Sequence, residues 1–216
     1  MGDFMDFFDL HCDTLTECMD DGDSLLKNER DIDFERGSIF GRWNQVFAVF
    51  VPDSMDDSLV EGYFDSACDF YFDELKKKGD VFPILSSEDV RGHSRGVMLA
   101  MESSRGVGSL ERLEKLYERG LRLITLTWNH KNRAAGGCDE GGGLTDWGRE
   151  LVSKMEKLGI VTDVSHLSDR SFYDLCEFSD APFIASHSDA RAVHNEVRSL
   201  TDDQIKIIIE RGGLIG

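Results

Sequence analysis

Short apolar runs alternate with amphipathic stretches along the 216-residue chain. The runs are rich in β-branched and aromatic residues, as in 43–51 (WNQVFAVFV), which is typical of strands that are buried on both faces. The predicted strands are 6–10, 43–51, 96–101, 121–127, 160–164, 183–186 and 213–216. The predicted helices cover about 57–78, 108–119, 145–158, 168–178 and 201–211. Repeated strand–helix units of this kind predict a parallel sheet with helices packed against it.

Three of the predicted helices carry start signals. Ser109, Thr145 and Thr201 each precede an amphipathic stretch that has an acidic or amide residue in its first turn and glycine after its end. A hydroxyl side chain at this position accepts a hydrogen bond from a free backbone N–H, and glycine readily ends a helix. These signals place the three helices between the predicted strands.

Polar residues gather after the carboxyl ends of five predicted strands. They are His11 and Asp13, Glu102, Trp128 to His130, His166, and His187. Active groups of a barrel come from several strand ends on one face, and no Gly-x-Gly-x-x-Gly turn follows the first strand to favour a dinucleotide-binding sheet. The prediction is therefore an α/β fold, a TIM-type (β/α)8 barrel. The strand count stops inside strand seven at GGLIG, so we expect the barrel to be truncated there.

Composition and charge narrow the function. The formal net charge of −18 opposes contact with phosphate backbones, so a nucleic-acid partner is not expected. No linker divides residues 1–216, which predicts a single domain. The opening MGDFMDFF lacks signal-peptide features, no apolar run has the length of a membrane anchor, and the five cysteines form no Cys-x-x-Cys pair. These features predict a cytoplasmic protein.

The first candidate motif is DLHCDT, residues 9–14. Residues two apart in a strand point to the same side, so His11 and Asp13 can face the barrel mouth together. An imidazole with a carboxylate suits zinc or a similar divalent ion. On its own, a His-x-Asp pair is more often a chance occurrence than a metal site.

Three further candidates each end an apolar strand: Glu102, His166 and His187. Alone, the carboxylate is more often a solvated terminus and each histidine a structural hydrogen-bonding residue. Their joint placement on separate strands, together with DLHCDT, is what indicates a metal site. A carboxylate has two oxygens, so Glu102 is able to bridge two metal ions.

The whole series of motifs resembles the renal (membrane) dipeptidase family. It consists of DLHCDT, Glu102, LRLITLTWN, GLTDWGRELVSKMEKLGIVTDVSH and APFIASHSDARAV followed by an arginine. The resemblance covers nearly the whole chain and is strongest from about 119 to 214. The family is a branch of the amidohydrolase superfamily of barrels with a binuclear zinc site. The resemblance therefore implies a metallo-dipeptidase, a hydrolase that cleaves the amide bond of a small dipeptide substrate.

The resemblance also implies roles for individual residues. Two zinc ions per chain are expected, with Glu102 bridging them and acting in catalysis. Arg198, eleven residues after His187, corresponds to the family arginine that binds the carboxylate of the substrate. A guanidinium fork suits a carboxylate. The implied ligands of the first ion are His11 and Asp13, and those of the second are His166 and His187.

Two departures from the family pattern affect catalysis. Animal members read Leu-Thr-His on strand four, where this chain has Trp128, followed by Asn129 and His130. Trp128 is expected at the substrate site, and whether Asn129 or His130 takes the catalytic role of the histidine stays open. The catalytic aspartate of the family, at the end of strand eight, would fall beyond Gly216.

Two alternatives remain. Other amidohydrolases, such as cyclic-amide hydrolases and deaminases, usually carry His-x-His on strand one and often a carboxylated lysine, which the His-x-Asp pair and Glu102 disfavour. An inactive metal-binding barrel fragment is the non-catalytic alternative. The unpaired strand edges of an incomplete barrel would favour association, for example as a homodimer.

Overall fold

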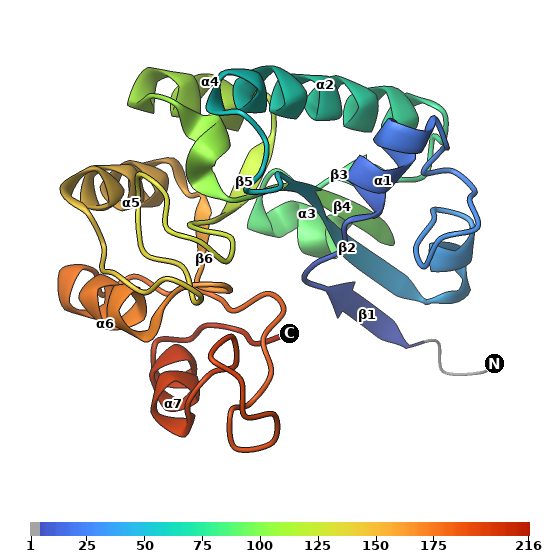
Figure 1. Ribbon diagram of the computed structural model, residues 1–216. Coiled ribbons are helices and arrows are strands. Elements are labelled where there is room, and N and C mark those ends of the chain that lie inside the picture. Colours follow the sequence, from blue (N-terminus) through green and yellow to red (C-terminus); the bar gives the residue numbers. More distant parts are fainter. Residues whose placement is uncertain (1–4) are drawn as a thin grey trace.

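A parallel sheet forms the centre of the computed structural model, which describes residues 5–216 (Figure 1). Residues 1–4, the start of the MGDFMDFF stretch, lie outside the described residues. The strand order is β1-β2-β4-β5-β6, and a short β3 pairs with β4. Every pair is parallel, which confirms the predicted α/β class. The strands are β1 (Asp6–Asp9), β2 (Arg42–Phe50), β3 (Phe82–Pro83), β4 (Arg95–Glu102), β5 (Leu121–Thr125) and β6 (Val161–Asp163).

The described part of the chain has seven α-helices: α1 (Thr14–Asp21), α2 (Asp57–Lys76), α3 (Ser87–Gly92), α4 (Leu110–Glu118), α5 (Asp146–Leu158), α6 (Asp169–Phe178) and α7 (Asp202–Glu210). In Figure 1, α2, α4, α5, α6 and α7 follow one another around the outside of the curved sheet, and α3 is not part of this row. Because every strand pair is parallel, the carboxyl ends of the strands meet at one edge of the sheet. Two short 3₁₀ turns, Arg36–Ile39 and Ser104–Val107, complete the set.

The two faces of the sheet bury different groups of side chains. Phe47 and Val49 of β2 belong to the main core, which the sheet shares with the surrounding helices. Val46 and Ala48, at the alternate positions, belong to a second and smaller cluster with residues of β4 and β5. This burial on both faces explains why the strands read as nearly continuous apolar runs. The smaller cluster fills the concave side of a half-barrel.

The helix start signals are confirmed. Ser109 and Thr145 each accept a hydrogen bond from the backbone N–H three residues further on, at 3.1 and 2.9 Å. Thr201 and Gln204 exchange two hydrogen bonds, each side chain with the backbone of the other residue, which is a capping box. Local sequence therefore defines where these helices begin.

The last two predicted strands are wrong in extent. Residues 183–186 and 213–216 contribute only single parallel bridges, Asp163 with Ile184 and Ala185 with Ile215. Each ladder is one residue long because the chain turns away after Ala185 into the loop that carries His187. The helices α1 and α3 and the strand β3 were not predicted, since each is too short for hydrophobic periodicity to register.

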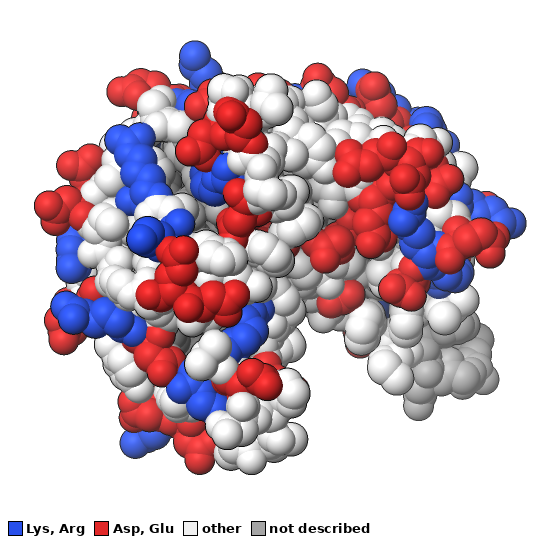
Figure 2. All heavy atoms as spheres, viewed as in Figure 1, with Lys and Arg blue, Asp and Glu red and all other residues white. Residues whose placement is uncertain are grey.

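The surface is acidic and visibly hollowed. Figure 2 shows Asp and Glu side chains over much of one face, with Lys and Arg in smaller groups between them. A hollow opens in the same view between the side that carries α7 and the edge that carries β1. From residue 5 onward, none of the helices combines the length and apolar character needed to cross a bilayer.

Candidate active site

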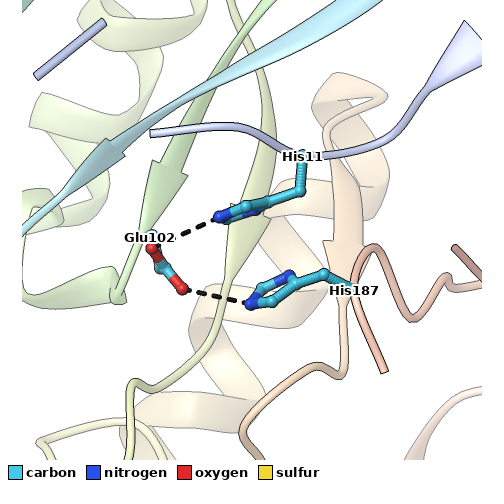
Figure 3. A group of neighbouring side chains, drawn as sticks. All are labelled: His11, Glu102 and His187. Carbon is cyan, nitrogen blue, oxygen red and sulfur yellow. Dashed lines mark ion pairs between the residues drawn. The ribbon is translucent and has the colours of Figure 1, made fainter. Parts of the chain in front are cut away.

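Four predicted ligands meet at the carboxyl ends of the strands. Glu102 is the last residue of β4 and is 2% exposed. His11 follows β1 by two residues, while His166 and His187 lie in the loops after β6 and after the bridge at Ala185. Figure 3 shows three of these side chains, His11, Glu102 and His187, pointing toward one another. Their ligand atoms all lie within 4.8 Å of one another, so these three residues are able to hold a metal ion.

The two oxygens of Glu102 face different partners. Oε2 lies 3.6 Å from Nε2 of His11, whereas Oε1 lies 3.0 Å from Nε2 of His166 and 3.4 Å from Nε2 of His187. Burial raises the pKa of Glu102, but its contacts with the imidazoles of His166 and His187 outweigh burial and hold that pKa well below its usual value. The site therefore has an ionised carboxylate at its centre, with one oxygen directed to each side.

Asp13 lies at the edge of the group. Its Oδ1 is 3.4 Å from Nε2 of His11, and about half of its side chain is exposed. The pKa of His11 is raised, because Asp13 and Glu102 together outweigh the lowering effect of burial. Asp13 is the N-cap residue of α1, which begins at Thr14, the last residue of the DLHCDT motif. The motif thus places Asp13 beside His11, whose ring faces Glu102.

The two later histidines form a donor set that fits a cation. Nδ1 of His166 lies 2.7 Å from Oδ1 of Asn129, a pure acceptor, so this nitrogen carries the proton. Nε2 of His166 therefore presents a lone pair 2.8 Å from Nε2 of His187. Two imidazole nitrogens at this distance, beside a carboxylate, suit a cation held between them. Burial lowers the pKa of His166, which favours the neutral imidazole that metal binding needs.

Backbone strain is concentrated at this site. Among residues 5–216, Ser103 and His166 are the two non-glycine residues with positive φ, at 76° and 69°. Such conformations cost on the order of 1–3 kcal/mol each and persist where the surrounding structure enforces them. The carbonyl of His166 accepts a hydrogen bond of 2.8 Å from the backbone N–H of Cys138, which helps to hold the loop. One strained residue follows Glu102 and the other is a predicted ligand.

The Trp128–His130 stretch separates into three environments. The ring of Trp128 lies between those of Phe50 and His166, at centroid distances of 5.1 and 6.1 Å. Asn129 contacts His166 directly, as described above. His130 instead forms an ion pair with Asp53, 2.6 Å from Nδ1 to the carboxylate, and is about half exposed. The structure brings Asn129, and not the ring of His130, into contact with the site histidines; a catalytic role for either stays a prediction.

Arg198 lies beside His187 rather than on the open surface. Its Nη1 donates to Oγ of Ser188 at 2.7 Å and its Nη2 donates to the carbonyl of His187 at 2.8 Å. Burial lowers the pKa of the guanidinium, against the raising effect of Asp163. These two bonds use two of the five N–H donors of an arginine.

Sequence reasoning missed two polar residues behind the site. Asp163, at the end of β6, is fully buried, and Ser186 is 3% exposed. Burial raises the pKa of Asp163, but the nearby ring of His187 and hydrogen bonds from Ser186 and Ser165 outweigh burial and lower that pKa. Both residues stood inside motifs already identified, TDVSH and FIASHSDA. The available signal was an acidic residue closing an apolar strand, the same signal that identified Glu102.

The fold and the site define a class of protein: a parallel α/β half-barrel whose strand ends carry histidines around a buried carboxylate. The chain belongs to the membrane dipeptidase family, peptidase family M19, whose family model matches residues 3–216. The family identified from the motifs is therefore confirmed. It is a family of hydrolases, and its members are metallopeptidases that act as dipeptidases.

Two bacterial relatives match part of this chain. An uncharacterized protein in the PQQ-III 3′ region of Acinetobacter calcoaceticus is 32% identical over 139 residues, which are 60% of this chain and 44% of the relative. An uncharacterized protein in the pqqA 5′ region of Klebsiella pneumoniae is 32% identical over 145 residues, 61% of this chain and 54% of the relative. The match thus spans about half the length of these relatives.

Two solved structures share the fold. The dipeptidase AC, a metallopeptidase of family M19, superposes with a TM-score of 0.89 at 24% identity, over 99% of this chain and 72% of its own. A metallopeptidase from Rhodobacter sphaeroides, liganded with a phosphinate mimic of the dipeptide L-Ala-D-Ala, gives a TM-score of 0.87 at 23% identity, over 99% and 74%. At these identities the similarity establishes the fold, and it supports the partial barrel.

Proposed function

We propose that this chain is a zinc-dependent dipeptidase that hydrolyses the amide bond of dipeptides at a binuclear metal site. The observation that carries the proposal is the position of Glu102. One of its oxygens faces His11, and the other faces His166 and His187. In a chain of the M19 family, a carboxylate shared in this way suits two adjacent divalent ions.

The fold proposal is a (β/α)8 barrel of which the described sheet is part. The curvature of the sheet supports it, as does the apolar cluster on the concave side, to which β2, β4, β5 and Ile184 all contribute. The single bridges at Ile184 and Ile215 continue the parallel order beyond β6. In a barrel, these strand ends would surround one active-site mouth.

Each proposed ion has its own residues. One zinc ion would be held by His11 and Asp13, and the other by His166 and His187. Glu102 would bind both ions. When bound, the ions would supply Lewis acidity toward the substrate carbonyl and lower the pKa of water. The neutral ring of His166 and the ionised side chain of Glu102 are the protonation states that such ligands require.

Other side chains would orient the substrate. Three N–H donors of Arg198 are not used in its bonds to Ser188 and His187, which leaves the guanidinium able to bind the carboxylate of a dipeptide. The indole of Trp128, near the ring of His166, would provide an apolar wall beside the scissile bond. Asn129 would hold the ring of His166 in place through Nδ1.

The test is hydrolysis of a panel of dipeptides, with L-Ala-D-Ala among them, by chelator-treated chain with and without added zinc. We expect turnover only with zinc, and none for Glu102→Ala. His194→Ala is the matched control, because His194 is exposed and lies outside the site. Turnover that survives Glu102→Ala would overturn the proposal. Zinc binding without turnover would favour the inactive barrel, and cleavage of cyclic amides alone would favour another amidohydrolase.

A further inference from the structure

Asp163 is a fully buried carboxylate that is not among the proposed metal ligands. It is the last residue of β6, three positions before His166. Burying an ionised carboxylate destabilises a protein unless hydrogen bonds compensate the lost hydration. A residue that served only packing at this position would not need a charge. The hydrogen bonds around Asp163 indicate what the charge does.

Four hydrogen bonds saturate this carboxylate. Oδ1 accepts from the backbone N–H groups of Ser165 and Ser186, both at 3.0 Å. Oδ2 accepts from two hydroxyls, Oγ1 of Thr125 at 2.7 Å and Oγ of Ser186 at 2.6 Å. Asp163 therefore ties together the carboxyl ends of β5 and β6 and the segment that leads into His187.

The bond from Ser186 determines where the next proton lies. A serine hydroxyl has one proton, and the ionised carboxylate of Asp163 can only accept, so this proton lies between Ser186 and Asp163. Oγ of Ser186 is then an acceptor toward Nδ1 of His187, which is 2.7 Å away. Nδ1 of His187 carries a proton, and its Nε2 keeps a lone pair that faces Oε1 of Glu102 at 3.4 Å.

We propose that Asp163 is a positioning residue that acts through Ser186 to fix His187 in the tautomer with a free Nε2. The consequence for metal binding rests on the proposed function, because a free Nε2 is what a metal ion would need from His187. The tautomer itself does not depend on a metal. Asn129 fixes His166 in the same tautomer from another loop, so both rings present the same nitrogen to Glu102.

The arrangement leads to different expectations for three substitutions. In Asp163→Asn, the amide oxygen has to stay at the position that accepts two backbone N–H groups, so the NH₂ group faces Ser186. Oγ of Ser186 then accepts a hydrogen bond from this NH₂ group, and its own hydroxyl proton is donated to Nδ1 of His187. Because Nδ1 becomes an acceptor, the proton of the imidazole ring moves to Nε2. Ser186→Ala removes the acceptor and releases the tautomer. Thr125→Val is the matched control, because it removes the other hydroxyl from the same oxygen and leaves the Ser186–His187 bond.

The first readout is the protonation of the His187 ring nitrogens in the metal-free chain. We would record proton–nitrogen NMR spectra of histidine-labelled protein at about pH 8, above the ordinary pKa of histidine, with His187 assigned from His187→Ala. The expected result is a proton on Nδ1 in the wild type and in Thr125→Val, a proton on Nε2 in Asp163→Asn, and a mixture in Ser186→Ala. Ser186→Thr, which keeps a hydroxyl, should restore the wild-type spectrum. An unchanged spectrum in both Asp163→Asn and Ser186→Ala would overturn the proposal.

The second readout is zinc affinity by competition with a chelator. We expect the dissociation constant to rise about 10- to 100-fold in Asp163→Asn, as is typical when a partner behind a metal ligand is lost. The rise should be smaller in Ser186→Ala and absent in Thr125→Val. Equal losses in all three variants, with an unchanged tautomer, would mean that the network is merely structural. If the wild type binds no zinc, the proposed function fails, while the spectra still decide the tautomer.

Discussion

The two sides of Glu102 are built differently. On the Oε1 side, His166 and His187 each have a hydrogen-bond partner on Nδ1, at 2.7 Å in both cases. On the Oε2 side, the polar contacts of the His11 ring are longer, 3.4 Å to Asp13 and 3.6 Å to Glu102, and the ring stacks on His187 at 3.7 Å between centroids. One side is held by buried hydrogen bonds, and the other by stacking and looser polar contacts.

This difference has a consequence for metal binding. Ligands that are already oriented lose little conformational freedom when an ion binds, whereas loosely held ligands have to be ordered at that moment. Asp13, about half exposed, is the most exposed of the proposed ligands. We therefore expect the side with His166 and His187 to bind its ion more tightly than the side with His11 and Asp13.

The largest effect is expected from Glu102→Ala, because it removes the one residue that the two sides share. Both ions should be lost together, with affinity falling by about 100-fold or more, since a shared ligand contributes to each site. Zinc content after dialysis, measured by elemental analysis, checks this. Loss of only one ion would show that Glu102 belongs to one side, and the His194→Ala chain provides the reference content.

A smaller and more selective effect is expected from His11→Ala. This substitution should weaken or abolish the lower-affinity zinc-binding step and leave the higher-affinity step in place. The substitution His166→Ala should instead remove the higher-affinity step. Calorimetric titration of zinc into chelator-treated protein resolves the two steps. If His11→Ala removed the tighter step, the order of the two sides would be the reverse of the one inferred here.

The buried network behind the tighter side should also stabilise the fold. Thr125→Val leaves Oδ2 of Asp163 with one hydroxyl donor instead of two. We expect the free energy of unfolding to fall by about 1–3 kcal/mol, the usual effect of a lost hydrogen bond to a buried group. Denaturant unfolding measures it. Thr162→Val, on the same strand as Asp163 but outside its hydrogen-bond network, is the control and should cost less.

The smallest effect concerns His130, which lies outside both sides. Its hydrogen bond to Asp53 raises its pKa, with smaller contributions from Glu140 and Asp139. A histidine whose pKa is higher in the folded than in the unfolded state stabilises the fold fully when the pH is below its unfolded pKa. This stabilisation is lost as the pH rises through the pKa of the folded state. Because His130 is exposed, the effect is small. The wild type should exceed Asp53→Asn in melting temperature at about pH 5.5 and match it at about pH 9.

The meeting of the candidate-site residues could be predicted from the sequence, because these residues follow strand ends. Glu102, His166 and His187 each close a short apolar run, and parallel strands bring such ends to one edge. The start signals at Thr145 and Thr201 worked for a similar reason, since a helix cap is a contact between residues three apart. Local features were sufficient for these predictions.

The network behind the site could not be predicted in the same way. Asp163 and Ser186 are 23 residues apart, and their contact depends on how two chain segments lie side by side in the folded protein. The extent of the last two strands depends on tertiary structure too, because apolar composition does not show where a ladder ends. Asn129 was identified as a candidate, but its contact with His166 arises only when the loops after β5 and β6 meet.

In the proposed function, Glu102 serves two ions, one at each oxygen. Anomalous diffraction at the zinc edge, from crystals grown with zinc, would locate both ions. We expect two peaks, one at Oε1 with His166 and His187 and one at Oε2 with His11 and Asp13. A single peak shared by His11, Glu102 and His187, the three residues whose ligand atoms already lie within 4.8 Å of one another, would contradict it.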